Sequence, residues 1–126
     1  MDRKLLLIGA VTGFLAVIAG TFAAHVLDPK LSLKAQKVFE TGVRYHMYHA
    51  LAIVAISCLC SRAASRLPAF AAGFFLAGVI VFSGSLYLLA VTGASWLGMI
   101  TPIGGVAFLV GWVLLFVMAW KQREAF

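Results

Sequence analysis

Acidic side chains are the scarcest chemistry in this sequence. Only four of its 126 residues are aspartate or glutamate, and its long apolar runs contain none of them. A four-helix exporter that exchanges protons for cations needs a carboxylate embedded in the membrane. The absence of one disfavours proton antiport of that type.

Motifs for catalysis and cofactor binding are also missing. The sequence has no phosphate-binding loop, no C-x-x-C pair and no haem-attachment motif. Cys58 and Cys60 would point to nearly opposite sides of a helix and could not easily form a disulfide. Ser83 and Ser85 flank Gly84, but they lack the strand–turn–helix context and the nearby acid of a nucleophile motif. We therefore expect no enzyme activity, no catalytic residues and no cofactor.

Charge of either sign is sparse, and its placement narrows the class of protein. Charged residues make up 11% of the chain and hydrophobic residues 63%, with a mean hydropathy of +1.06. Such a composition excludes a soluble domain, because there is too little polar surface to cover it. The net charge of +6 sits at the ends of apolar runs rather than in a patch with interleaved aromatics. This pattern argues against nucleic-acid binding and predicts a protein embedded in the lipid bilayer.

Four apolar runs predict the fold class, an all-α membrane protein with a four-transmembrane-helix bundle. A bilayer core about 30 Å thick requires about 20 apolar residues in each helix that crosses it. The segment between the first two runs is amphipathic, with a possible N-cap at Ser32 and an i,i+4 pair of Glu40 and Arg44. We predict it to be an interfacial helix over residues 32–44. The predicted spans are 5–27, 45–61, 68–91 and 97–120.

Loops and their charges predict how the chain crosses the membrane. Asp28-Pro29 should end the first helix, and Thr92 to Ser95 should form the turn between the last two. Counting lysine and arginine favours both termini in the cytoplasm, by six residues against four. The six are Arg3, Lys4, Arg62, Arg66, Lys121 and Arg123, and the four are Lys30, Lys34, Lys37 and Arg44.

Small residues recur along the predicted spans at helical spacing. Such faces let membrane helices approach closely, because lipid supplies no hydrophobic drive for their association. They predict helix packing and assembly into a homo-oligomer or with another membrane protein. The helix-packing candidates are Gly9, Gly13, Gly20, Gly84, Gly104 and Gly111.

Polar residues of all four predicted spans fall in the half of the membrane away from the cytoplasm. They could line a cavity for a small molecule, a lipid headgroup or an ion, or they could simply bond between helices. A metal site from His25, His46 and His49 is a third possibility, but His46 and His49 are displaced from each other around the helix, so we predict no metal. The candidate ligand-binding residues are His25, Tyr45, His49, Tyr87 and Thr101.

Four stretches resemble a known family. They are GTFAAHVL (20–27), FETGVRYHMYHALAI (39–53), VFSGSLYLLAVTG (81–93) and TPIGGVAFLVGW (101–112). They are similar to the small bacterial inner-membrane proteins of domain-of-unknown-function family 423. Ala24 and His46 depart from its pattern, in which glycine and glutamine are usual. The motifs mark His25, Tyr45, His49, Ser83, Ser85, Tyr87, Thr101 and Pro102.

The resemblance implies a four-helix protein of the cell inner membrane and brings no established activity. We therefore expect a non-enzymatic accessory or homo-oligomeric membrane component. The alternative is binding or transport of a small molecule, lipid or ion through the His/Tyr cluster.

Overall fold

A computed structural model describes residues 1–60 and 65–121, and within these ranges the chain forms helices and turns without strands. The prediction of an all-α protein is therefore confirmed. Three short segments depart from α geometry: the π-helices η1 and η3 and the 3-10 helix η2. The elements are α1 (Arg3–Phe22), η1 (Ala23–Leu27), η2 (Asp28–Lys30), α2 (Leu33–Leu59), α3 (Leu67–Gly78), η3 (Val79–Ser83), α4 (Gly84–Thr92) and α5 (Leu97–Lys121).

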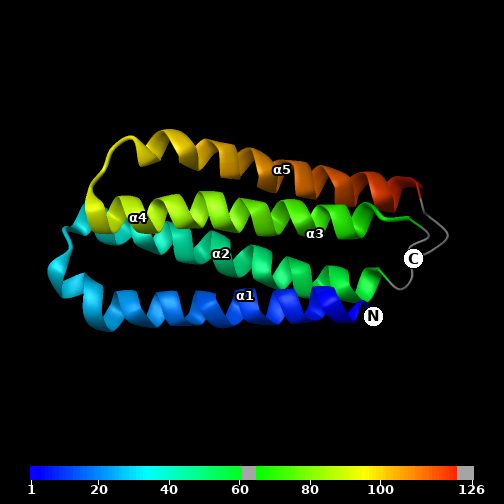
Figure 1. Ribbon diagram of the computed structural model, residues 1–126, viewed down its shortest axis with the longest axis horizontal. Helices are drawn as coiled ribbons and strands as arrows, with labels where there is room; N and C mark the ends of the chain where they lie inside the picture. Colours follow the sequence, from blue (N-terminus) through cyan, green and yellow to red (C-terminus); the bar gives the residue numbers. More distant parts are fainter. Residues whose placement is uncertain (61–64, 122–126) are drawn as a thin grey trace.

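Four antiparallel rods lie side by side (Figure 1). The elements α3, η3 and α4 run on without interruption, and we call them the α3–α4 rod (67–92). Across the molecule the order is α1, α2, the α3–α4 rod and α5, so that α1 packs mainly on α2 while α5 packs on α3. Three rods are long and apolar enough to cross a membrane: Arg3–Lys30, Leu67–Thr92 and Leu97–Lys121.

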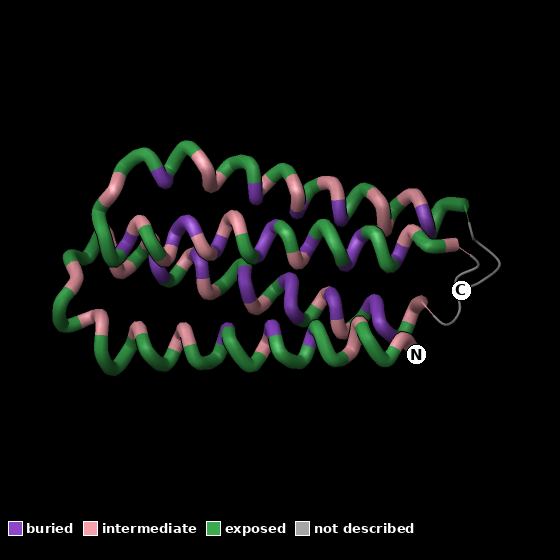
Figure 2. Tube along the Cα trace, in the orientation of Figure 1, coloured by how far each residue is buried: buried purple, intermediate pink, exposed green. Residues whose placement is uncertain are grey.

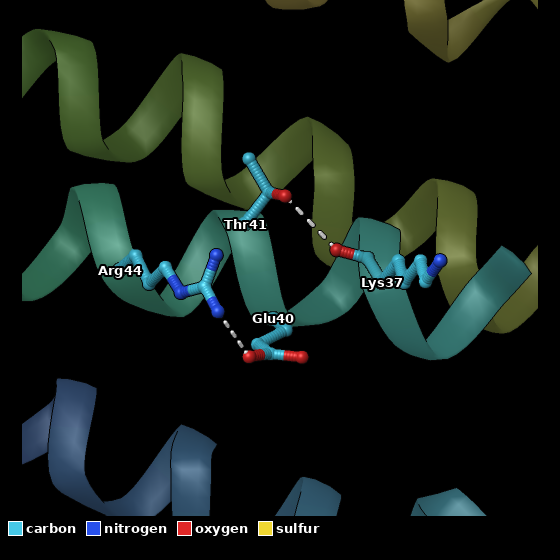
Figure 3. A network of polar contacts seen from close by, with 4 residues as sticks. All are labelled: Lys37, Glu40, Thr41 and Arg44. Carbon is cyan, nitrogen blue, oxygen red and sulfur yellow. Dashed lines mark hydrogen bonds and ion pairs between the residues drawn. The ribbon is translucent and has the colours of Figure 1, made fainter. Parts of the chain in front are cut away.

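The predicted amphipathic segment runs directly into the predicted second span, and the two form α2, one continuous helix of 27 residues. No boundary at Tyr45 separates an amphipathic segment from a span. The exposed ion pair of Glu40 and Arg44 belongs to the same helix as the buried residues that follow it in α2 (Figure 3). The end of the predicted second span at Ser61 lies outside the described residues, as do two residues of the charge count, Arg62 and Arg123.

α2 is also buried on the sides that face α1 and the α3–α4 rod (Figure 2). Its buried side chains include two histidines, so its interior position coincides with the lowest hydropathy. These polar side chains explain why α2 is not among the three rods that are long and apolar enough to cross a membrane. Burial among helices, rather than contact with lipid, lets this rod carry polar groups.

Local signals fix the ends of the rods. Ser32 Oγ accepts a hydrogen bond from the Ala35 N–H at 3.1 Å, which confirms the predicted N-cap of α2. α4 ends at Gly93, whose φ of 72° is the left-handed conformation that glycine adopts without strain. Its N–H donates to the Leu89 carbonyl. The turn predicted at Thr92 to Ser95 is therefore present.

Most of the predicted packing glycines meet a neighbouring helix of the same chain. A Cβ added at Gly9 would lie 2.7 Å from Val54 Cγ2, and one at Gly104 would lie 2.7 Å from Phe82 Cβ. Gly111 is similarly pressed against Phe75, and Gly13 and Gly20 are in ordinary contact with α2. The glycine faces are therefore largely used inside one molecule.

Gly84 makes no such contact among the described residues of the molecule. A Cβ built at this position meets no atom within 4 Å in the described part of the chain. The physical reason is that α1 leans on α2 and leaves this face of the α3–α4 rod uncovered. Gly84 therefore opens a space instead of closing a contact.

Candidate functional site

His46 of α2 and Tyr87 of α4 form a hydrogen-bonded pair across the bundle. The distance from His46 Nδ1 to Tyr87 Oη is 2.9 Å, and His46 is only 7% exposed. Gly42, one turn before His46, makes this approach possible, because a Cβ there would lie 2.8 Å from Tyr87 Cε1. The ring of Phe39 packs against the ring of Tyr87, with the two ring centroids 4.6 Å apart. The tyrosine is thus held against α2 with its hydroxyl directed at the imidazole.

This pair contributes to the lining of an apolar groove of about 580 Å³, which we call the His46 groove. It runs between α1 and the α3–α4 rod, where Gly84 leaves open space. Its polar members are Thr12, His46 and Tyr87, and the rest of its lining is apolar. The complete lining is Leu7, Ile8, Val11, Thr12, Leu15, His46, Leu76, Val79, Ile80, Gly84 and Tyr87.

The partners of His46 define its tautomer. Besides Tyr87, the imidazole has the backbone of Thr12 in α1 as a hydrogen-bonding neighbour. We assign the ring proton to Nε2, toward the Thr12 backbone, so that Nδ1 accepts from the Tyr87 hydroxyl. Tyr87 Oη then keeps acceptor capacity for a donor in the groove. The arrangement can therefore bind one polar hydrogen inside an otherwise apolar space.

His49, one turn further along α2, has a closed environment. Its Nδ1–H donates to the Tyr45 carbonyl at 2.7 Å, and its Nε2 accepts from Trp112 Nε1–H at 3.1 Å. Its ring stacks on Phe108 with centroids 3.7 Å apart and planes 9° from parallel. Both ring nitrogens are occupied, so neither has a lone pair for a metal or a ligand. His49 ties α2 to α5.

A second, aromatic groove of about 420 Å³ lies beside His49. It is bordered by α2, η3 and α5, and we call it the aromatic groove. Its lining is Tyr45, Tyr48, His49, Phe82, Gly105, Phe108, Leu109 and Trp112.

The five candidate ligand-binding residues do not meet at one place. Tyr45 and His49 border the aromatic groove, whereas Tyr87 lines the His46 groove. Thr101 Oγ1 lies 2.6 Å from Ser85 Oγ, between α5 and α4. His25 is exposed on η1. A shared depth in the membrane does not determine the direction in which each side chain points. In the structure, these side chains lie on different sides of the bundle.

The histidines do not form a metal centre either. His46 bonds to α4 and His49 to α5, so their side chains diverge although they are three residues apart. Within residues 1–60 and 65–121, no three histidine, cysteine, aspartate or glutamate side chains are grouped to hold a metal ion.

Sequence reasoning missed three residues of these sites: Thr12, Gly42 and Trp112. Trp112 carried a usable signal, because it lies in the middle of an apolar run, where an indole N–H must find an internal acceptor. The sequence suggests His46 only as a possible metal ligand, whereas the structure pairs it with Tyr87. Thr12 and Gly42 gave no local signal, since their roles depend on α2 and α4 respectively.

The family model described as "Protein of unknown function (DUF423)" matches residues 19–105. The chain is 44% identical to "UPF0382 membrane protein YwdK" of Bacillus subtilis, over 94% of this chain and 98% of that protein. It is 37% identical to "UPF0382 inner membrane protein YgdD" of Escherichia coli, over 98% of this chain and 94% of that protein. No solved structure matches. Because this family model matches residues 19–105 and the relatives named as membrane proteins match most of the chain's length, the chain belongs to the DUF423 family of membrane proteins of unknown function.

Proposed function

We propose that this protein is a non-enzymatic, four-span protein of the inner membrane that binds a membrane-soluble molecule in the His46 groove. The molecule has an apolar body and one hydrogen-bond donor, such as a hydroxyl group. The observation that carries the proposal is the His46–Tyr87 pair, a polar acceptor site in a groove that is otherwise apolar.

The length and position of α2 support a fourth span. Its 27 residues extend about 40 Å at 1.5 Å per residue, which is enough to cross the bilayer. α2 lies between α1 and the α3–α4 rod, which are both apolar enough to cross. The six-to-four count of basic residues supports cytoplasmic termini. The charged first third of α2 would then lie in the opposite interface.

The volume and chemistry of the groove support a small apolar ligand. Ligand pockets commonly have about 300–1,000 Å³, a range that includes the 580 Å³ found here. Inside a bilayer an apolar body gains little by leaving the lipid. Recognition must then come from shape and from the hydrogen bond to Tyr87 Oη. A polar pair that faces such a space has the character of a functional site in a membrane protein.

Two features support binding over catalysis and over assembly through glycine faces. The pair lacks a carboxylate or nucleophile within its described surroundings, so it does not make a catalytic set. Of the six predicted packing glycines, five already pack inside the described part of the molecule and Gly84 does not. A second copy or another membrane protein that places a helix against Gly84 is therefore the competing occupant.

Native mass spectrometry of the protein, extracted from its own membrane into lipid nanodiscs, tests the proposal. We expect a stoichiometric small mass on a monomer. Gly84→Leu should remove it, because the leucine side chain would occupy the His46 groove from a Cβ that meets no atom of the described residues within 4 Å. Gly73→Leu is the matched control: a Cβ there also meets no atom within 4 Å in the described part of the chain, and Gly73 does not line the groove.

The outcomes separate the alternatives. Loss of the small mass in Gly84→Leu but not in Gly73→Leu supports binding in the groove. An additional polypeptide that Gly84→Leu removes would instead identify the groove as an assembly interface. An empty monomer, or a small mass that both variants retain, would contradict the proposal.

A further inference from the structure

A basic cleft lies at the end of the bundle where η2, the start of α2 and the end of α4 meet. It measures about 570 Å³, and its charged members are Lys30 and Lys34. Within the described residues, neither lysine forms an ion pair with a carboxylate. Hydroxyl groups of Thr92 and Ser95 are on the opposite wall. The cleft is lined by Lys30, Leu31, Ser32, Lys34, Ala35, Val38, Leu89, Ala90, Val91, Thr92, Gly93 and Ser95.

The basic cleft and the aromatic groove occupy the same face of α2. Val38 lines the cleft and Tyr45 the groove, and their spacing of seven residues, two helical turns, keeps them in line. Lys34 lies on this face before Val38, and His49 lies on it after Tyr45. Lys34 and His49 are 15 positions apart. A charged end therefore continues along one helix face into an aromatic, apolar end.

The length of this face matches one leaflet of a membrane. Fifteen residues of α-helix from Lys34 to His49 cover about 22 Å. That is half of a bilayer that is roughly 40–45 Å thick with its headgroups. Lysine at the start of the face would lie among headgroups, and the rings of Tyr45, Phe82 and Trp112 would lie at the depth of acyl chains.

We propose that this face binds one anionic phospholipid. Its phosphate would lie between Lys30 and Lys34, and one acyl chain would follow α2 into the aromatic groove. The charge of the cleft selects an anionic headgroup over a zwitterionic one, and the leaflet-long face selects a lipid over a soluble anion. This site goes beyond the proposed function, because the His46 groove lies on another side of α2 and takes an uncharged polar group.

Quenching of Trp112 by lipids with brominated acyl chains tests the proposal. Trp96 and Trp120 are exposed and can be replaced by phenylalanine, which leaves Trp112, in the aromatic groove, as the single tryptophan to be excited selectively. The full chain is reconstituted in phosphatidylcholine vesicles containing either brominated phosphatidylglycerol or brominated phosphatidylcholine. We expect phosphatidylglycerol to quench Trp112 at a several-fold lower mole fraction.

Charge variants locate the preference. Each basic residue near an anionic surface changes binding by about fivefold, so Lys30→Gln combined with Lys34→Gln should abolish a several-fold preference. Lys37→Gln is the matched control for Lys34→Gln alone, because each removes one charge and Lys37, three residues further along α2, does not line the cleft. Lys34→Arg, which keeps the charge, should retain the preference.

Three results would overturn the proposal. The first is equal quenching by the two lipids in the parent protein. The second is an equal loss of preference in Lys37→Gln and in Lys34→Gln alone, which would reveal only diffuse attraction to the surface. The third is recovery of fluorescence on adding millimolar inorganic phosphate, which would identify a soluble anion as the ligand. Gly84→Leu should leave Trp112 quenching unchanged, so a failure here is separate from a failure of the His46 groove.

Discussion

Two histidines of one helix, three residues apart, occupy opposite kinds of environment. His49 is enclosed, with both ring nitrogens bonded and its ring stacked on Phe108. His46 is just as buried in area, at 7% against 4% exposed, but its partner Tyr87 lines an open groove.

The difference teaches that burial alone does not separate a structural histidine from a binding histidine. The two kinds of histidine differ in whether their hydrogen-bond partners have any remaining capacity to bond to a ligand. At His49 the hydrogen-bond chain ends on a carbonyl and an indole N–H, which have nothing further to offer. At His46 it passes to a hydroxyl that can still accept, and there the chain is open to a ligand.

His49→Ala should have the largest effect on stability. It removes a stacked ring, leaves a cavity beside Phe108 and deprives the Trp112 N–H and the Tyr45 carbonyl of their partner. We expect a loss of about 2–4 kcal/mol in the free energy of unfolding, measured by equilibrium unfolding in mixed micelles. Binding in the His46 groove should persist in the folded fraction. Loss of the ligand without loss of stability would reverse the roles of the two histidines.

Gly42→Ala should disrupt the hydrogen bond between His46 and Tyr87. The new methyl group would lie 2.8 Å from Tyr87 Cε1, so the tyrosine or α4 must move away from α2. Overpacking of this kind costs about 1–3 kcal/mol. Because the Tyr87 hydroxyl would be displaced, the variant should also lose the ligand of the His46 groove, as measured by native mass spectrometry. Gly73→Ala, at a position open to space, serves as the control and should change neither property.

Tyr87→Phe and Trp112→Phe form a matched pair of hydrogen-bond deletions. Each removes one donor to a histidine and should cost about 1 kcal/mol of stability. Only Tyr87→Phe should abolish ligand binding, because only its hydroxyl is available in the His46 groove. His46→Gln, which keeps an acceptor for Tyr87, should retain more binding than His46→Ala. Equal binding in Tyr87→Phe and Trp112→Phe would remove the distinction between the two sites.

Glu40→Gln should have the smallest effect and sets the baseline for polar contacts on α2. The pair of Glu40 and Arg44 is exposed, with 57% and 59% of the side-chain surfaces accessible (Figure 3). Such an i,i+4 pair contributes about 0.3–0.5 kcal/mol. We expect a loss of that size in the same unfolding measurement, and none in ligand binding. A loss comparable to that of His49→Ala would show that the start of α2 is held by more than helix packing.

Much of the fold could be read from local patterns. Apolar runs predicted the rods, Ser32 predicted the start of α2, and Thr92 to Ser95 predicted the last turn. The change from charged to apolar sequence near Tyr45 lies within one helix, as a helical segment that feeds directly into a span requires. Glycine periodicity predicted close contacts at Gly9 and Gly104, but it could not distinguish them from Gly84, which faces open space.

Local sequence is sufficient to predict that the chain is apolar, helical and poor in acidic groups, because composition, hydrophobic runs and helix breakers act over a few neighbouring residues. Which histidine is enclosed and which belongs to a groove depends on the packing of the rods. The partner of His46 lies 41 residues away and that of His49 lies 63 residues away. The directions of such side chains depend on how four rods pack, and no local pattern contains that packing.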